Sequence, residues 1–482
     1  MGHTNKAVVI GAGISGLACA FHLQQLGIQP LVLEASAKPG GAISTIIRNG
    51  FVFEGGPQFP RFPEPVWKLV KELKLENEFV AGNPKAKRYI VRDGHLHQAP
   101  FSAKGLLSTR LLSLKSKLRL LSEPFRNSHP PATEESLAEF VQRKFGAEVL
   151  DYLVDPFIST IFFSDAHNMG MQSAFPALVE WERSRGSVAR GAISAYKSKR
   201  TAPSPHISKS QSQTNSATLA VTDALPSLGS FRRGMGTLTQ TLSDALRDHV
   251  HFAAKVESVI PMALSNEGAQ PGSRVRLSNG EEIFTDAVVM ALPAYAAAPL
   301  FQQSAPDLSS LLASIEHLPL AVVASAHHRN QVRHPLDGFG FMVPRREGLH
   351  TICTFWNSSL FPEHSPTETV LMTSFARTHT SDDSTDISSE TLPQSIAAEN
   401  ARILGITGAP IDRVVWRYPQ ALPQYNVGHA QRVTRIRQSL AELPGLYLAG
   451  NFLAGRSIGD CTESGFRAAE DLHSHFQAAA SK

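Results

Sequence analysis

Cysteine is scarce in this chain of 482 residues, which contains only Cys19, Cys353 and Cys461. The three lie far apart, so the spacing excludes a disulfide scaffold and a structural zinc site and suits a reducing compartment. Long apolar runs are lacking too, because no stretch of about 20 apolar residues occurs and no membrane-spanning helix is expected. The apolar run from Ala7 is broken at Gly11, so we expect no signal peptide and a mature chain that begins with its first strand.

An excess of charge of either sign is also missing. The chain has 46 Lys and Arg against 42 Asp and Glu, a net charge of +4. This small excess does not indicate a nucleic-acid partner. Hydrophobic residues make up 42% and charged residues 18%, a composition typical of soluble globular enzymes that excludes global disorder. We therefore expect a cytoplasmic protein with two or three domains.

The N-terminal segment has the pattern of a βαβ unit. Residues 7–10 form a short apolar run ended by glycine, as in a buried parallel strand. Residues 14–26 have helical periodicity and stop at Gly27, and residues 31–33 form the next strand. Near the far end, residues 445–451 are typical of a strand and turn, followed by a helix over 465–477.

Two apolar segments between these ends, 287–292 and 414–418, are further strand candidates. A sheet assembled from both ends of the chain implies a discontinuous nucleotide-binding domain. The predicted fold class is therefore α/β, with a discontinuous Rossmann-like domain, a mixed-sheet substrate domain and a helical insertion.

Gly11-Ala12-Gly13-Ile14-Ser15-Gly16 is a G-x-G-x-x-G fingerprint between the first strand and the first helix. Its glycines allow a tight turn, approach of the backbone to a pyrophosphate and close packing of the helix on the strand. Glu34 follows about 20 residues later at the end of the second strand, where a carboxylate accepts both ribose hydroxyls. An acid at this position disfavours the 2′-phosphate of NADP.

FAD and NAD share this fingerprint, and two further glycine pairs favour FAD. Gly40-Gly41 and Gly55-Gly56 follow soon after Glu34. Glycine pairs let backbone pass close to a bulky ligand, as a long buried flavin dinucleotide requires.

Together these motifs resemble the flavin-containing amine oxidases. The C-terminal run Gly450-Asn451-Phe452-Leu453-Ala454-Gly455-Arg456-Ser457-Ile458-Gly459-Asp460-Cys461 narrows the resemblance to the oxygen-dependent protoporphyrinogen oxidases. Further matching segments lie along nearly the whole chain. The residues that the resemblance implies for FAD binding are Gly11, Ala12, Gly13, Ile14, Ser15, Gly16, Glu34, Ala35, Gly41, Ala42, Gly56, Pro57, Gln58, Phe59, Val256, Asn451, Arg456, Ser457 and Ile458.

The resemblance also divides the chain. It implies FAD-binding parts at 1–85, 226–298 and 411–482, a helical, membrane-facing insertion with a first substrate-domain part at 86–225, and a second substrate-domain part at 299–410.

The chemistry that the resemblance implies is oxidation of protoporphyrinogen IX to protoporphyrin IX by dioxygen, with six electrons removed and hydrogen peroxide released. Flavin carries such chemistry without a catalytic side chain, so none is assigned. No metal site is expected either, because the adjacent His327 and His328 point apart on a strand. Oligomerisation stays open.

The porphyrinogen ring is apolar and its propionates are anionic, so aliphatic walls and arginines should line its site. The resemblance places Arg61 at a propionate and Leu336 and Ile352 against the ring; for the two aliphatic residues a plain core role is equally expected. One segment departs from the family's glycine-rich pattern: residues 159–165 carry Thr160 and Ser164 where glycines are usual, and Phe163 where a small residue is usual. These larger side chains are expected to narrow or reshape the part of the substrate pocket that this segment lines.

Other functions remain open at this point. The first alternative is oxidation of coproporphyrinogen III, whose four propionates would need several more cations beside Arg61. A second is oxidation of amines or carotenoid precursors, although no aromatic cage or lysine relay of an amine oxidase is evident. A third is a flavin-binding protein without turnover.

Leucines alternate with cations in residues 104–125. This pattern allows a peripheral contact with the inner face of the cell membrane. On the sequence pattern alone, an ordinary helix whose leucines enter the core is the favoured interpretation.

Overall fold

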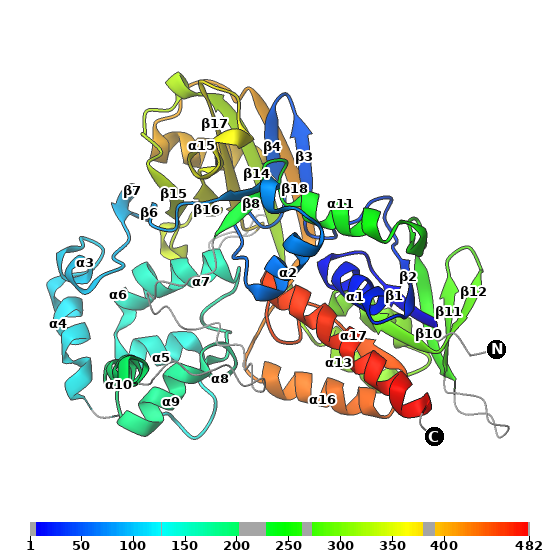
Figure 1. Cartoon of the computed structure of the whole chain (residues 1–482). Coiled ribbons are helices and arrows are strands. Elements are labelled where there is room, and N and C mark those ends of the chain that lie inside the picture. The colour runs from blue at the N-terminus through cyan, green and yellow to red at the C-terminus, as the bar shows by residue number, and fades with distance from the viewer. Residues whose placement is uncertain (1–5, 127, 202–227, 263–271, 379–390, 481–482) are drawn as a thin grey trace.

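The computed structural model describes residues 6–126, 128–201, 228–262, 272–378 and 391–480. Two regions of the molecule are built around sheets and a third consists of helices (Figure 1). Figure 1 shows the seven-stranded sheet at the top, the N-terminal βαβ unit on the right and the helical region on the lower left.

The first sheet has five parallel strands in the order β19-β13-β1-β2-β9. They are β1 (Lys6–Ile10), β2 (Gln29–Leu33), β9 (Val250–His251), β13 (Ala287–Met290) and β19 (Leu446–Leu448). β13 is buried along its whole length, as expected for a strand covered on both faces. The predicted discontinuous domain is confirmed at this level, because its sheet draws strands from both ends of the chain.

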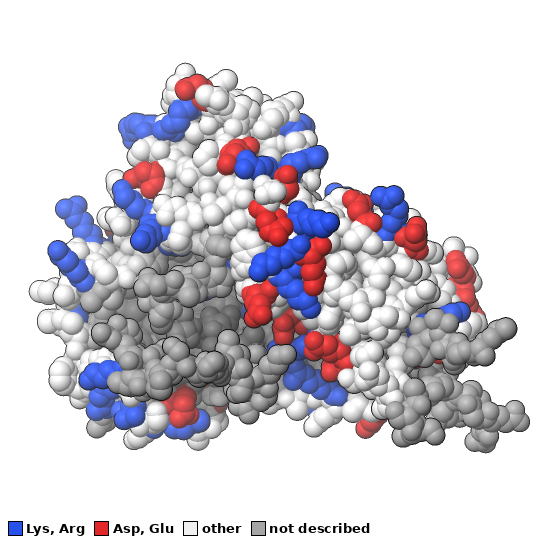
Figure 2. All heavy atoms as spheres, in the orientation of Figure 1, with Lys and Arg blue, Asp and Glu red and all other residues white. Residues whose placement is uncertain are grey.

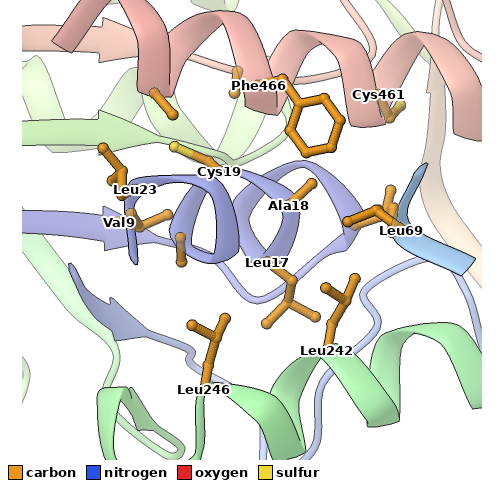
Figure 3. Packing of buried hydrophobic residues seen from close by; sticks show 14 of the residues in the cluster. Val9, Leu17, Ala18, Cys19, Leu23, Leu69, Leu242, Leu246, Cys461 and Phe466 are labelled. Carbon is orange, nitrogen blue, oxygen red and sulfur yellow. The ribbon is translucent and has the colours of Figure 1, made fainter. Parts of the chain in front are cut away.

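Helix α17 (Ile458–Ala480) lies along α1 (Ile14–Gln25). A Cβ at Gly465 would lie 2.3 Å from the Ser15 backbone oxygen, so the two helices approach closely. Figure 3 shows Phe466 and Cys461 of α17 on one side of α1, and Leu242 of α11 (Gly236–Ala245) on the other. The helix predicted over 465–477 begins at residue 458 because Ser457 and Asp460 cap it, with the Asp460 amide donating to Ser457 Oγ at 3.1 Å.

The second sheet has seven strands in the order β18-β14-β17-β16-β15-β6-β7. All neighbours are antiparallel except β15 and β6, so it is the mixed sheet that was predicted. Its strands are β6 (Lys87–Arg92), β7 (His95–Gln98), β14 (His317–His328), β15 (Gly338–Met342), β16 (Thr351–Phe355), β17 (Thr369–Ala376) and β18 (Asp412–Pro423).

β18 departs from the expected organisation. Its residues 414–418 were predicted with the nucleotide-binding part that begins at 411, but they form the edge of the seven-stranded sheet. The physical reason is that β18 is exposed or half-exposed along most of its length, whereas the inner strands β1 and β13 of the five-stranded sheet are buried on both faces.

Short strands form three smaller sheets in the described residues. β3 (Thr45–Arg48) pairs with β4 (Phe51–Glu54), β5 (Phe79–Ala81) with β8 (Gly229–Phe231), and β10 (Val256–Met262), β11 (Gly272–Leu277) and β12 (Glu282–Thr285) form an antiparallel sheet. The other helices outside the helical region are α2 (Glu64–Glu72), α12 (Ala294–Ala297), α13 (Pro306–Ala313), α14 (Asn357–Leu360), α15 (Leu392–Leu404) and α16 (His429–Ala441).

The helical region follows β7 and contains α3 (Ala103–Ser108), α4 (Leu114–Ser122), α5 (Leu137–Lys144), α6 (Ala147–Val149), α7 (Asp155–Ile161), α8 (Met171–Ala174), α9 (Pro176–Arg185) and α10 (Val188–Thr201). A buried ion pair between Lys144 and Glu123, 3.0 Å apart, joins its elements, and Glu182 lies 3.3 Å from the same ammonium group. No helix in the described ranges is long and apolar enough to cross a membrane.

Candidate functional site

The fingerprint loop Gly11–Gly16 combines tight packing with one open position. A Cβ at Gly16 would lie 1.9 Å from the Gly11 backbone oxygen, and one at Gly11 would lie 2.7 Å from that of Ala291. By contrast, a Cβ at Gly13 would meet nothing within 4 Å. Gly13 is also the N-cap of α1, where no side chain caps the helix. The loop therefore leaves room and backbone N–H groups for a pyrophosphate.

Glu34 directly follows β2, beside this loop. Its Oε2 accepts a hydrogen bond from the Ala12 amide at 2.7 Å and its Oε1 accepts one from the Ser36 amide at 2.8 Å. The backbone that leads to Val256 lies next to it, because the Ala254 amide donates to the Glu34 carbonyl at 2.9 Å. Ala35, between Glu34 and Ser36, is exposed. These predicted residues are thus brought together at one end of the site.

The second group of predicted residues packs against the fingerprint. The Gly40 amide donates to the Ala12 carbonyl at 2.9 Å, which places Gly41 and Ala42 beside the loop. A Cβ at Gly56 would lie 2.1 Å from the Ala42 oxygen, so the two glycine-containing segments touch. Buried Gln58 donates to the Gly56 carbonyl at 2.9 Å, and Pro57 lies between them.

Glu54 is a buried carboxyl group next to this second group of residues. It is 1% exposed and accepts hydrogen bonds from the Met235 amide at 2.6 Å and the Thr45 hydroxyl at 2.7 Å. Burial raises the pKa of its carboxyl to about 8. Tyr418 of the seven-stranded sheet donates to the Gly55 carbonyl at 3.1 Å, so the same segment joins both sheets.

The C-terminal turn reaches the site from the other side. The Tyr425 hydroxyl donates to the Asn451 carbonyl at 2.6 Å, and Ser457 caps α17, whose first residue Ile458 is buried. Arg456 donates through Nη1 to the carbonyls of Phe162 and Pro423, at 2.8 and 2.9 Å. The turn is therefore fixed to the helical region as well as to β18.

Five phenylalanine rings, which we call the aromatic row, line the region between the glycine segments and the seven-stranded sheet. In order, ring centroids are 4.8 Å apart from Phe339 to Phe59, 4.6 Å to Phe355, 5.7 Å to Phe375 and 4.9 Å to Phe163. Phe59, Phe355 and Phe163 are half-buried. The row gives a long apolar wall that follows directly from the predicted cofactor residue Phe59.

Arg88, which was not predicted as a site residue, lies at one end of this row. Its guanidinium is 4.0 Å from the centroid of Phe339. Burial and the nearby charge of the exposed Arg61 lower the pKa of Arg88. Its sequence signal is weak: Arg88 occupies the same side of β6 as the buried Ile90, where an apolar residue is usual.

The two predicted aliphatic residues have different surroundings. Ile352 is buried in the cluster that contains Phe163, Phe355 and Phe375, so it adjoins the aromatic row. Leu336 is buried in a separate cluster with Val91 and Trp356, which matches the plain core role. Their contact with a substrate stays a prediction.

The segment that departs from the family pattern forms the far end of the row. Phe163 has a φ of 45°, a left-handed conformation uncommon for a bulky residue. Its ring packs on Phe375, and the Ser164 hydroxyl accepts a hydrogen bond from Arg456 at 3.0 Å. The larger side chains occupy space that glycines would leave open.

Within the described ranges, no group of three or more His, Cys, Asp or Glu side chains could hold a metal ion. His327 is buried and His328 is exposed, so the adjacent pair points apart. The residues that fit a cofactor here are those of a dinucleotide site: an open glycine position at a helix N-terminus, a carboxylate at the strand end and close glycine backbone.

Comparison with known proteins identifies the group to which these features belong. Residues 14–473 match the family of flavin containing amine oxidoreductases. The chain is 30% identical to protoporphyrinogen oxidase 2, chloroplastic/mitochondrial, of Arabidopsis thaliana, over 98% of this chain and 94% of that protein. It is 27% identical to coproporphyrinogen III oxidase of Bacillus subtilis (strain 168), over 96% of this chain and 97% of that one.

A solved structure shares the fold. It is a crystal structure named "Putative protoporphyrinogen oxidase from Exiguobacterium sp. 255-15", with a TM-score of 0.78, 22% identity and coverage of 98% of this chain and 99% of that chain. The family match and the full-length relatives account for the FAD-type site built above. The chain belongs to the flavin containing amine oxidoreductases and, among them, to the protoporphyrinogen oxidase family, and it is an FAD-dependent oxidoreductase.

Proposed function

We propose that this protein oxidises a porphyrinogen to the porphyrin in heme biosynthesis, with protoporphyrinogen IX as its substrate and dioxygen as the oxidant. The observation that carries the proposal is the aromatic row with Arg88 at its end and Arg61 nearby. An apolar wall of phenylalanine rings beside a pair of cations complements an apolar macrocycle with anionic propionates. Full-length similarity to protoporphyrinogen oxidases supports the same substrate class.

The fingerprint loop and the glycine segments would hold FAD, which would supply two-electron redox chemistry: three turnovers would remove six electrons from the substrate and reduce dioxygen to hydrogen peroxide. The protein's own residues orient and enclose the substrate. The half-buried rings of Phe59 and Phe355 contact the macrocycle and exclude water from it. Arg88 and Arg61 hold a propionate, which sets the rotation of the ring.

Steady-state oxidation with purified FAD-loaded protein tests this function. We expect dioxygen uptake and hydrogen peroxide release when protoporphyrinogen IX is added, with the porphyrin formed detected by its fluorescence. The Arg88→Met variant should raise KM about tenfold or more, the effect of losing a charge-assisted hydrogen bond. Lys85→Met, which removes an exposed cation three residues earlier, is the matched control. Absence of dioxygen uptake by the wild type contradicts the proposal and leaves a flavin-binding protein without turnover.

The second candidate substrate is coproporphyrinogen III, and one observation favours it. Three further arginines, Arg345, Arg377 and Arg456, lie around Ser164 or beside the aromatic row, as a substrate with four propionates would need. Oxidation of coproporphyrinogen at a higher kcat/KM than protoporphyrinogen would select this candidate. Turnover of an amine but of neither porphyrinogen would select the amine oxidase alternative.

Membrane contact is proposed as part of this function, because protoporphyrinogen is poorly soluble. The leucines of residues 104–125 divide: Leu111 and Leu112 are buried, whereas Leu114 and Leu118 of α4 are 73% and 59% exposed. Phe125, directly after α4, is 88% exposed. Figure 2 shows Lys and Arg beside surface of other residue types at the left edge, over α3 and α4. This surface supports a cytoplasmic protein that rests on the inner face of the cell membrane.

A further inference from the structure

Phe163 ends the aromatic row on the side opposite to Arg88. Its φ of 45° lies in the left-handed region, which bulky residues rarely adopt. The ring is half-buried and packs on Phe375, with centroids 4.9 Å apart. A bulky side chain keeps so unfavourable a backbone conformation only where other contacts hold it. Contacts that fix the backbone at this residue are therefore expected.

Side chains from three distant segments supply these contacts. The carbonyl of Phe162 accepts a hydrogen bond from Nη1 of Arg456 at 2.8 Å. The carbonyl of Ser164 accepts one from Nη2 of Arg345 at 3.3 Å. Between them, the carbonyl of the ring-bearing residue accepts one from Nε2 of Gln424 at 3.3 Å. Three consecutive carbonyls are thus held by side chains, so the backbone cannot relax without losing these hydrogen bonds.

The ring fixed in this way lies beside the cofactor segments. It packs in the apolar cluster that also contains Tyr418, whose hydroxyl donates to the Gly55 carbonyl at 3.1 Å. On the other side, Arg456 belongs to the C-terminal turn that is predicted to bind FAD. A substrate that lies along the aromatic row next to these segments meets the Phe163 ring at its edge remote from Arg88.

The other arginines near this edge are engaged with the protein itself. Arg345 lies 3.3 Å from Asp155 and 3.5 Å from Asp165, so its charge is balanced. Arg377 donates to the Leu349 carbonyl at 3.4 Å, and its Nη2 is shielded from solvent. The substrate edge is therefore met by a phenyl ring rather than by these guanidinium groups.

We propose that Phe163 is a specificity-determining residue, whose ring closes the far end of the aromatic row and selects a macrocycle with small uncharged substituents at the edge remote from Arg88. The proposal rests on the porphyrinogen oxidation inferred above and deepens it by naming the substrate class. Protoporphyrinogen IX carries vinyl groups where coproporphyrinogen III carries two further propionates. A propionate against the ring would lose hydration and gain no hydrogen-bond donor, so the ring favours protoporphyrinogen IX.

Substitutions that shorten the side chain at residue 163 test the proposal. The quantity measured is the ratio of kcat/KM for coproporphyrinogen III to that for protoporphyrinogen IX, with FAD content recorded for each variant. Phe163→Gly removes the ring and suits the left-handed backbone, and it should raise this ratio about tenfold or more, as expected when an apolar pocket is enlarged. Phe163→Leu retains part of the bulk and should give an intermediate ratio.

Phe145→Leu is the matched control, because Phe145 is also half-buried but packs on Phe140 in the helical region, with ring centroids 6.4 Å apart. This variant should leave the ratio unchanged. An unchanged or lower ratio in Phe163→Gly overturns the proposal, as does an equal rise in Phe145→Leu. Should Phe163→Gly not retain FAD, Phe163→Leu decides by the same criterion.

Failure of the proposed function is distinguishable from failure of the specificity proposal. If the wild type oxidises neither porphyrinogen, the binding of coproporphyrin III and protoporphyrin IX to the FAD-loaded protein is measured by fluorescence quenching. Tighter binding of coproporphyrin to Phe163→Gly, with less change for protoporphyrin, supports selection by the ring without turnover. Equal effects on both porphyrins overturn it.

Discussion

His429 shows how a single buried residue couples the C-terminal turn to pH. Its ring stacks on Tyr425 with centroids 4.2 Å apart, and its Nε2 lies 3.0 Å from the Phe452 carbonyl. A carbonyl only accepts, so Nε2 carries the proton, while the buried Nδ1 has no partner. The imidazole is therefore held neutral, and burial lowers its pKa to about 4.

The pH dependence of unfolding checks this role. An unfolded histidine titrates near pH 6.5, so between about pH 6.5 and 4 the unfolded state binds more protons than the folded state. The contribution of His429 to stability is full above pH 6.5 and is lost as the pH falls toward 4. We expect the wild type to lose roughly 2–3 kcal/mol more than His429→Phe across this range, from denaturant unfolding at fixed FAD. Equal losses in the two proteins would contradict this origin.

At the scale of elements, two glycines in the loop between β1 and α1 have different roles. Gly16 is needed for packing, because a Cβ there would overlap the Gly11 backbone oxygen at 1.9 Å. Gly13 has open space around its Cβ position, so its use is approach of the backbone to a ligand.

Alanine substitutions should separate these uses. We expect Gly13→Ala to keep the unfolding midpoint of the FAD-free protein and to weaken FAD binding by at least tenfold. Gly16→Ala should lower that midpoint, with a cost of about 1–3 kcal/mol for overpacking. Thermal unfolding of FAD-free protein and titration with FAD measure both effects. A Gly13→Ala variant that binds FAD normally would show that no ligand approaches there.

The surface of α4 carries the membrane proposal. Arg119, although it belongs to this helix, donates to the carbonyls of Gln142 and Arg143 at 2.9 and 3.1 Å and so serves the packing of α5. Lys115 and Lys117 are the cations of α4 that remain for lipid headgroups, each contributing about 1 kcal/mol near an anionic surface.

Vesicle pelleting tests this surface. We expect the wild type to pellet with phosphatidylglycerol vesicles at low salt, and Lys115→Glu combined with Lys117→Glu to remain in the supernatant with FAD bound. Lys71→Glu combined with Lys74→Glu, a charge reversal of equal size at exposed positions near α2, should still pellet. If the wild type never pellets, the exposed leucines serve another purpose and the contact is refuted.

At the scale of the whole molecule, the cofactor site joins segments that are hundreds of residues apart. Residues 11–16 and 34–42 contact the segments around residues 254 and 291, and Ser15 lies against Gly465 of α17. FAD held by such an assembly depends on the folded chain rather than on one bond.

Denaturation should therefore release the flavin. Cys461 is the thiol nearest to the C-terminal turn, but it is buried against α1 (Figure 3), and burial raises its pKa to about 12, which keeps it protonated and unreactive. We expect acid precipitation to leave the yellow flavin in the supernatant. Flavin that stays in the pellet would establish a covalent link and refute this prediction.

The sequence by itself determined the nucleotide-binding part, and the reason is local. The buried strand at residues 7–10, the glycine fingerprint and Glu34 lie within a short stretch, where spacing alone prescribes the contacts. The same holds for the C-terminal motif. Its Ser457 and Asp460 cap a helix that begins at residue 458, although the sequence pattern predicted a start at residue 465. The FAD chemistry and the α/β class were predictable for this reason.

Only the tertiary structure decided the rest, because it depends on pairings between distant segments. Residues 414–418 resemble a buried strand in isolation, yet pairing with β14 makes them the edge of the mixed sheet. The aromatic row brings together rings from β15, β16, β17 and two loops, and no sequence period links them. Arg88 looks like an ordinary strand cation in the sequence, and only the structure shows that it is partly buried beside Phe339, which marks it as a candidate substrate contact.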